Sequence, residues 1–130
     1  MVISRSQRGF TLIELLIVIS LVLILLSFAI PNYRRSIVLA NETVLKEDLF
    51  TLRRTIDEFT YDRKRAPQSL DELVQTGYLK QIPKDPITRE PDWDPTMETD
   101  VISEGVELGI ADVHSSSKLL STQGTAYSSW

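Results

Sequence analysis

The feature that most constrains this chain is an apolar run over residues 10–30. Seventeen of these 21 residues are apolar, and the run carries a single charge, Glu14. As a helix rising about 1.5 Å per residue, it spans roughly 30 Å, which is the hydrocarbon thickness of a bilayer. An ordinary secretory signal has an apolar core of only about 7–15 residues. The run therefore predicts a membrane-spanning helix.

The rest of the chain has a different character, so the mean hydropathy of −0.05 hides two unlike parts. Residues 31–130 hold 29 of the 32 charges, which leaves room for one modest polar domain but not for a large two-domain enzyme. The net charge of −4 offers no broad basic face for nucleic acid. The absence of cysteine excludes disulfides and thiolate metal sites.

Glu14 is the one costly residue of the apolar run. A carboxylate costs about 2.5–3.5 kcal/mol at the bilayer centre and less near one end of the span. No lysine or arginine occurs within residues 9–33 to neutralise it. Two interpretations stay open, namely that the side chain reaches the membrane interface or that it has a partner in an assembly. A cut just before Phe10 would create an amine that could pair with Glu14 of a neighbouring copy.

The sequence around Glu14 resembles a known signal. The run Arg-Gly-Phe-Thr-Leu-Ile-Glu-Leu-Leu-Ile-Val at residues 8–18 is similar to the class III signal of type IV pilins and pseudopilins. The resemblance implies that a prepilin peptidase cuts between Gly9 and Phe10 and that Phe10 is then N-methylated. It places the family's glutamate at Glu14 and its helix-bending proline at Pro31, both as residues of filament assembly.

The domain organisation follows from this resemblance and from the hydropathy pattern. Residues 1–9 are interpreted as a leader peptide and residues 10–30 as the transmembrane and filament-core helix. Residues 31–62 continue the helix, because apolar residues recur there at three- and four-residue spacing. These are Val38, Leu45, Leu49, Leu52, Ile56 and Phe59. The opposite face is interpreted as solvated and carries the i,i+4 pairs Glu42–Lys46, Arg53–Asp57 and Arg54–Glu58.

Residues 63–130 are predicted to form a small globular domain. The capping box at residues 69–72 predicts a short helix that Gly77 stops. Alternating apolar residues at 106, 108 and 110 predict a half-buried strand, and Gln123-Gly124 predicts a turn before a closing strand or tail at 127–130. The expected fold class is α+β and type IV pilin-like, with the long N-terminal helix packed on a small antiparallel sheet of three or four strands.

The proline pattern of this domain resembles one branch of the family. A proline, a short helix, Gly-Tyr-Leu at 77–79 and Pro-Lys-Asp-Pro at 83–86 are similar to the type II secretion major pseudopilin, the G-type protein. The turn residues within 83–86 are interpreted as turns rather than as a site. The residues that follow, 87–93, meet the pattern of that branch only in part.

Residues 91–117 contain seven acidic residues and no lysine or arginine. Oxygen ligands of this kind suit calcium, and the major pseudopilins often bind calcium in a carboxy-terminal loop. Asp92, Asp94 and Asp112 are the candidate ligands. The spacing is not that of an EF-hand, and Lys118 stands where a further acid would help, so a solvated acidic face is the alternative. No other cofactor is expected.

The segment from Asp112 to Ser117 contains the residue types of a hydrolase triad. Adjacent strand residues point to opposite faces, and no oxyanion-hole signal accompanies them. The chain also has no phosphate-binding loop, so any motor would be a separate ATPase. The chain is therefore not expected to be an enzyme.

The resemblance implies a structural subunit, the major pseudopilin of a type II secretion pseudopilus, which assembles into a helical filament that supports protein export. The expected partners are further copies of the chain, prepilin peptidase, the inner-membrane assembly platform with its secretion ATPase, minor pseudopilins and the membrane, but not nucleic acid. The expected location is the bacterial inner membrane, with a single pass, a periplasmic carboxy-terminal domain and a periplasmic filament. The alternatives are a type IV pilin of an adhesive or motility fibre and a single-pass, membrane-anchored binding domain.

Overall fold

The computed structural model describes residues 9–98 and 108–130. Its elements in chain order are helix α1 (Leu12–Arg63), helix α2 (Leu70–Gln75), strand β1 (Asp94–Met97), strand β2 (Ile110–His114) and the 3₁₀ helix η1 (Tyr127–Ser129). The chain divides into two compact units between Ile37 and Val38. Each unit is described by itself below.

Helix α1 covers both segments for which the sequence predicts helix. At its start the Thr11 hydroxyl accepts a hydrogen bond from the Glu14 N–H at 3.3 Å, which satisfies one of the free donors of the first turn. At its end Arg63 supplies a positive charge to the last turn, and Lys64 adopts a left-handed φ of 57°. The helix continues through Pro31.

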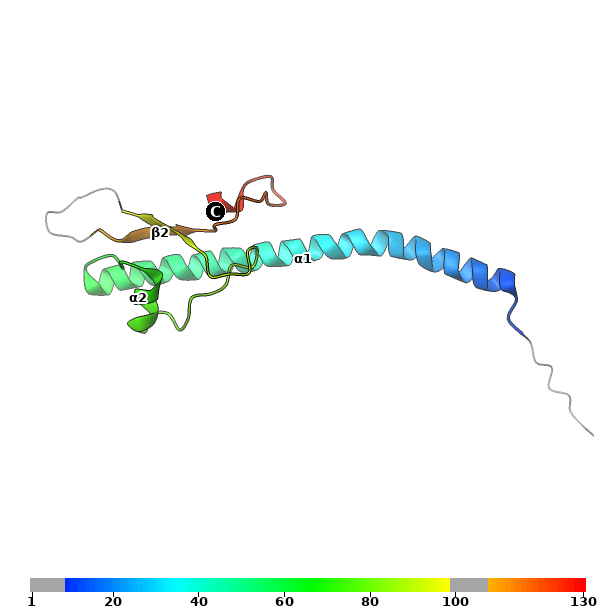
Figure 1. Cartoon of the computed structure of the whole chain (residues 1–130), viewed down its shortest axis with the longest axis horizontal. Coiled ribbons are helices and arrows are strands. Elements are labelled where there is room, and N and C mark those ends of the chain that lie inside the picture. The colour runs from blue at the N-terminus through cyan, green and yellow to red at the C-terminus, as the bar shows by residue number, and fades with distance from the viewer. Residues whose placement is uncertain (1–8, 99–107) are drawn as a thin grey trace, which may run out of the picture. The chain divides into compact units, whose positions relative to one another are not determined.

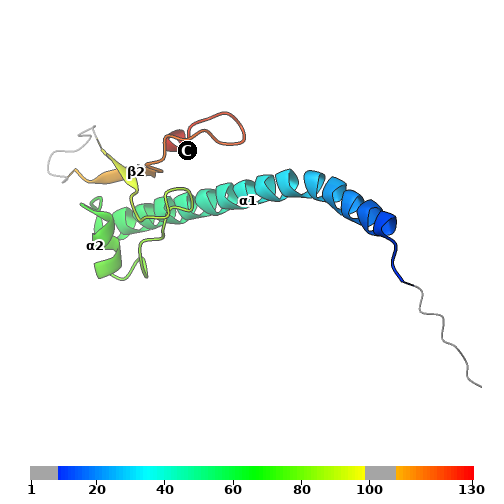
Figure 2. The same cartoon turned by 45° about the vertical axis from the view of Figure 1, so that its right-hand side comes forward.

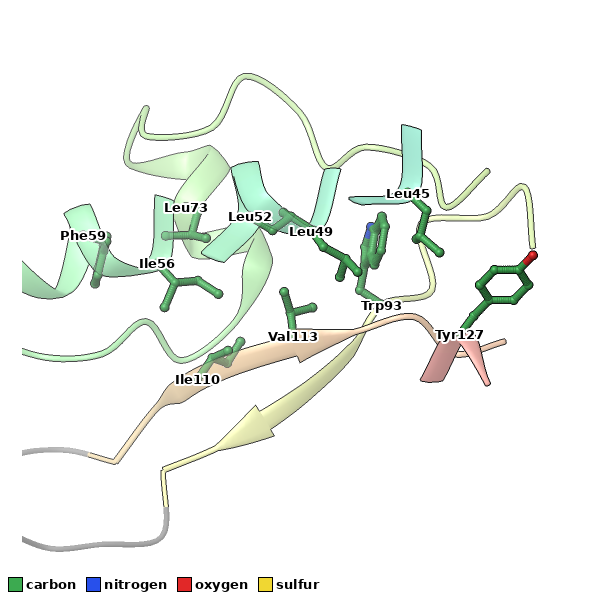
Figure 3. Packing of buried hydrophobic residues seen from close by; sticks show 10 residues of the cluster. All are labelled: Leu45, Leu49, Leu52, Ile56, Phe59, Leu73, Trp93, Ile110, Val113 and Tyr127. Atoms are coloured by element: carbon green, nitrogen blue, oxygen red, sulfur yellow. The ribbon is translucent and has the colours of Figure 1, made fainter. Parts of the chain in front are cut away.

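The core of the second unit lies between α1 and the segments packed along it. Figures 1 and 2 show α2, β2 and the carboxy-terminal segment beside the same part of α1. Five of the six predicted apolar positions on α1 are buried, whereas Val38 remains 39% exposed. They pack against Leu73 of α2, Trp93, Ile110 and Val113 of β2, and Tyr127 of η1 (Figure 3). This packing of a long helix on a small antiparallel sheet confirms the predicted α+β class.

The sheet is smaller than the sequence predicts. Within the described residues it has two strands, with Asp94 opposite His114 and Met97 opposite Ile110. The expectation of three or four strands is therefore wrong for this part of the chain. Strand β2 begins at the last of the three alternating residues, and Val106 lies outside the described residues. The segment at 127–130 forms η1 rather than a closing strand, and only an isolated bridge joins Leu120 to Ala126.

The capping box and the turn before the acidic segment form as predicted. Ser69 caps α2 by accepting a hydrogen bond from the Glu72 N–H at 3.2 Å. Asp85 does more than mark a turn, because it is fully buried. Its carboxylate accepts hydrogen bonds from the Ile87 N–H at 2.7 Å and from the Ser115 hydroxyl. Asp85 thereby holds the loop that follows Pro83 against the end of β2.

The largest difference between the predicted and the observed contacts concerns Glu42, which the sequence pattern places on the solvated face of α1. The residue is only 4% exposed, and its carboxylate accepts hydrogen bonds from the Thr122 N–H (2.7 Å), the Thr122 hydroxyl (2.6 Å) and the Tyr127 hydroxyl (2.9 Å). Burial acts to raise the pKa of Glu42, but the bonds from Thr122 and Tyr127 outweigh burial and lower it. Lys46, its predicted partner, lies over the Trp130 ring instead.

Arg53 is likewise not paired with Asp57. Its guanidinium donates to Asp112 at 2.7 Å, to the Val113 carbonyl at 3.0 Å and to the Trp130 carbonyl. The planar guanidinium group has five N–H donors and can hold several acceptors at once. A local pair with Asp57 on the helix would leave most of these donors unused. The third predicted pair, Arg54 with Glu58, is present at 3.0 Å.

Candidate processing and assembly site

Gly9 and Phe10 precede the first turn of α1 and are exposed. Phe10 is 73% exposed, although it is the first large apolar residue of the run. A Cβ placed on Gly9 would have no atom within 4 Å, and Gly9 does not adopt a left-handed φ. Glycine is usually needed in a fold either because a side chain would clash or because the backbone adopts a left-handed φ. The structure therefore gives no folding reason for glycine at this position.

The apolar part of α1 satisfies its own hydroxyl groups. The Ser20 hydroxyl donates to the Leu16 carbonyl at 2.7 Å, and the Ser27 hydroxyl donates to the Ile24 carbonyl at 2.6 Å. Bonds of this kind let serine reside in an apolar environment. The large apolar side chains of this part of α1 are exposed. Within the described residues, α1 is the one helix that is long and apolar enough to cross a membrane, and the mean hydropathy of its most apolar window is 3.0.

The Glu14 carboxylate has no such partner. Its backbone N–H is held by Thr11, but among the described residues no hydrogen bond or ion pair involves its side chain. An acid in the first turn interacts favourably with the helix dipole, which is a local role for Glu14. The cap at Thr11 was not predicted above, although the spacing Thr-x-x-Glu at 11–14 is the signal that identifies it.

Pro31 lies inside α1 and removes one donor from the helix. A proline has no N–H, so the carbonyl four residues earlier, at Ser27, lacks its usual partner. The bending role implied for Pro31 remains a prediction.

The structure does not gather the three candidate calcium ligands into one site. No group of three or more acidic or histidine side chains in 9–98 and 108–130 is placed to hold a metal. Asp92 accepts hydrogen bonds from the hydroxyls of Ser116 (2.6 Å) and Thr88, which lower its pKa, while Asp94 is exposed on β1. Burial acts to raise the pKa of Asp112, but the bonds from Val113 and Arg53 outweigh it and lower the pKa.

The triad residue types do not form a catalytic arrangement either. His114 ends β2, and its Nε2 lies 3.4 Å from Asp112 Oδ2. Its Nδ1 is buried without a hydrogen-bond partner in the described residues. Ser115 donates to Asp85, Ser116 donates to Asp92, and neither pairs with the histidine.

Comparisons with known proteins give one motif match and a set of relatives. The motif family described as the prokaryotic N-terminal methylation motif matches residues 4–30. Type II secretion system core protein G of Klebsiella michiganensis is 32% identical over an alignment of 98 residues, and the match covers 63% of this chain and 69% of the relative. Core protein G of Aeromonas hydrophila is 33% identical over an alignment of 99 residues, and the match covers 64% of this chain and 69% of the relative.

The chain belongs to the type II secretion system core protein G family. Membership confirms the resemblance seen in the sequence and makes the protein a structural subunit, a major pseudopilin, rather than an enzyme. The competence protein ComGC of Halalkalibacterium halodurans is 31% identical over a shorter segment of 76 residues, which is 58% of this chain and 74% of that relative. No solved structure gives a significant match.

The matched motif covers most of the candidate processing and assembly residues of this pseudopilin. Residues 4–30 include Gly9, Phe10 and Glu14, and Pro31 lies one residue beyond the match. The unpartnered carboxylate, the glycine without a folding role and the apolar span therefore all belong to the segment that the pseudopilin shares with proteins carrying this motif.

Proposed function

We propose that this pseudopilin is cut between Gly9 and Phe10 by a prepilin peptidase, and that Phe10 becomes its N-methylated first residue. The processed chain joins further copies in a helical filament in the periplasm, and the filament supports export by a type II secretion system. The carboxy-terminal domain reaches the periplasm, while the leader of residues 1–9 stays in the cytoplasm.

The state of the Glu14 carboxylate is the observation that carries this proposal. In an apolar environment a carboxylate without a partner is costly, and the two hydroxyls of the same span are already satisfied. Cleavage after Gly9 creates an amine at Phe10. That amine on a neighbouring copy would neutralise Glu14, so pairing links processing to assembly.

The exposed Gly9 supports the cleavage step. A peptide bond must be accessible in an extended segment to enter a protease, and Gly9 and Phe10 lie outside α1. Because neither space nor backbone conformation requires glycine there, a requirement for glycine would reflect recognition by the peptidase.

The apolar surface of α1 supports transfer from membrane to filament. Its exposed side chains are dry in lipid and would be dry again when bundled with neighbouring helices, so assembly does not expose them to water. The inner-membrane assembly platform, its secretion ATPase and the minor pseudopilins are the partners that this transfer requires.

Two variants test the proposal in cells that assemble the filament. Glu14→Gln keeps the size of the side chain and removes its charge, so we expect normal membrane insertion and cleavage but no incorporation into filaments. Ser20→Ala is the matched control, because its hydroxyl bonds only its own helix. Filaments built normally from Glu14→Gln chains would overturn the pairing mechanism.

Mass spectrometry of the wild-type chain tests the processing step separately. We expect a mature chain that begins with methylated Phe10. A chain that functions in secretion with Met1 still present would contradict cleavage and favour the membrane-anchored binding domain instead.

A further inference from the structure

A shallow groove opens on the second unit beside α1. Its volume is about 350 Å³, and its lining is Val38, Asn41, Pro86, Ile87, Arg89, Leu119, Leu120 and Tyr127. Leu119 and Leu120 are 65% and 69% exposed, which is unusual for adjacent leucines in a small domain. The lining contains one cation and no acid. The groove therefore suits an apolar side chain that has a carboxylate beside it.

Arg89 is placed at this groove by the backbone and not by an ion pair. Its N–H donates to the Asp85 carbonyl at 2.7 Å, and its φ is 66°. Within the described part of the chain no ion pair involves its guanidinium. A charge held in position without a counter-charge is available to an incoming acid.

A complementary feature lies elsewhere on α1. Phe50 is 61% exposed, although aromatic residues are costly to leave in water. Glu47 lies three residues earlier and is therefore its neighbour on the helix surface. The cations around Phe50 are already engaged: Lys46 with the Trp130 ring, Arg53 with Asp112 and Arg54 with Glu58. Glu47 is left as the acid beside the exposed ring.

We propose that Phe50 of one copy inserts into the groove of a second copy beside Ile87 and Leu120, while Glu47 of the first copy pairs with Arg89 of the second. The inference rests on the proposed function, because it names the contact by which the domains of neighbouring subunits join.

The positions of the two surfaces explain why the partner is a further copy. Asn41 lines the groove and Phe50 is nine residues later on the same helix, which is about two and a half turns. The two residues therefore lie on opposite sides of α1. One copy can fill a neighbour's groove and have its own groove filled at the same time, and such head-to-tail contacts build open helical assemblies.

A pair of cysteines tests the contact directly, because the full chain contains none. We expect filaments of the Phe50→Cys, Leu120→Cys chain to form a ladder of disulfide-linked multimers on mild oxidation. Each single-cysteine variant lacks one of the two cysteines and should give no disulfide-linked multimers. Tyr61→Cys with Leu120→Cys is the matched control, since Tyr61 is 75% exposed but lies three turns further along α1. A dimer from either single variant would indicate a symmetric contact and overturn the proposal.

Filament formation and the contact are measured separately. Electron microscopy and the mass of the mature chain test the proposed function, whereas the ladder tests the contact. Filaments that give no ladder overturn this inference and leave the proposed function intact. If no filaments form, the double-cysteine chain is oxidised in membranes instead. A ladder there supports the proposed contact, and its absence contradicts the contact.

Reversal of the charges provides a second test. In the Phe50→Cys, Leu120→Cys chain, Glu47→Arg and Arg89→Glu should each reduce the ladder at least tenfold. The combination of the two charge changes should restore it. Because each single variant carries an exposed charge, neither should alter the fold, which the near-ultraviolet circular dichroism of the chain in detergent would verify. Ladders from both charge variants that equal the ladder of the parent Phe50→Cys, Leu120→Cys chain would exclude the Glu47–Arg89 pair.

Discussion

The Glu42 carboxylate accepts a hydrogen bond of 2.9 Å from the Tyr127 hydroxyl across a separation of 85 residues. Both groups are buried, and Thr122 supplies two more donors to the same carboxylate. Burial, followed by the bond to Glu42, raises the pKa of Tyr127 to about 12, so the phenol remains a donor at neutral pH. This cluster joins α1 to the segment around η1.

We expect Glu42→Gln to lower the free energy of unfolding by about 1.5–3 kcal/mol, because it removes a charged acceptor from buried donors. Tyr127→Phe should cost about 1–2 kcal/mol and leave the ring packing intact. The double variant should lose less than the sum, since both changes remove one shared bond. Urea unfolding of the full chain in detergent measures these differences, and strictly additive losses would contradict a direct bond.

The lowered pKa of Glu42 predicts a dependence on pH. A carboxyl whose pKa is lower in the folded state stabilises the fold above its ordinary value of 4.5 and loses that contribution as the pH falls through the folded pKa. Wild type should therefore lose stability below about pH 4.5, and Glu42→Gln should lose less over the same interval. Asp92 and Asp112 act in the same direction, so the variant keeps part of the slope. Parallel curves for both chains would show that Glu42 does not contribute.

Gly109 is expected to tolerate no side chain. A Cβ there would lie 2.6 Å from the Pro67 carbonyl oxygen and 2.8 Å from the Ala66 Cβ, and neither atom belongs to a flexible side chain. Gly109→Ala should destabilise the fold by about 1–3 kcal/mol through overpacking. Gly9→Ala in the uncut chain is the control, because Gly9 has open space, and its unfolding midpoint should match wild type. Equal midpoints for all three chains would contradict the close approach.

Arg53 and Arg54 provide a matched pair of substitutions on adjacent residues. Arg53→Ala should cost about 1–3 kcal/mol, because its guanidinium joins α1 to Asp112, Val113 and Trp130. Arg54→Ala removes only an exposed i,i+4 pair and should cost about 0.2–0.5 kcal/mol. Thermal unfolding measures both, and equal costs would mean that the bonds to β2 do not stabilise the domain.

Calcium is expected to have no effect on the unfolding midpoint. Asp112 is already paired with Arg53, and Asp92 is already bonded by Ser116. Calcium is added to protein that has been freed of metal with a chelator, and thermal unfolding at each calcium concentration tests this expectation. A rise in the midpoint that Asp112→Asn abolishes would contradict it and restore the candidate site.

The hydropathy pattern predicted the parts of the fold that depend on neighbours along the chain. The span of α1, its buried row from Leu45 to Phe59 and the cap of α2 all arise from local spacing or from contacts within a few residues. The same local reasoning failed for Glu42 and Arg53. Helix spacing offers each of them a partner four residues away, but burial and better geometry favour partners 80 and 59 residues away.

The sheet shows the same limit from another side. β1 contains Asp94 and Pro95, residue types that are depleted in strands, and its side chains are exposed. Only pairing with β2 makes this segment a strand, and pairing cannot be read from the composition of either strand alone. At the amino terminus the motif identified the candidate residues, because that signal is short, ordered and local.

The dependence of Glu42 on Thr122 also fixes an order of events during synthesis. At roughly 5–20 residues per second, the ribosome reaches Thr122 about 4–16 s after Glu42. Throughout that interval the carboxylate lacks its donors, and the apolar row of α1 lacks Tyr127, the last of the core residues that cover it in the finished domain. The nascent pseudopilin thus spends seconds as a long, half-covered helix, a period in which a chaperone or the membrane surface can protect it from premature association.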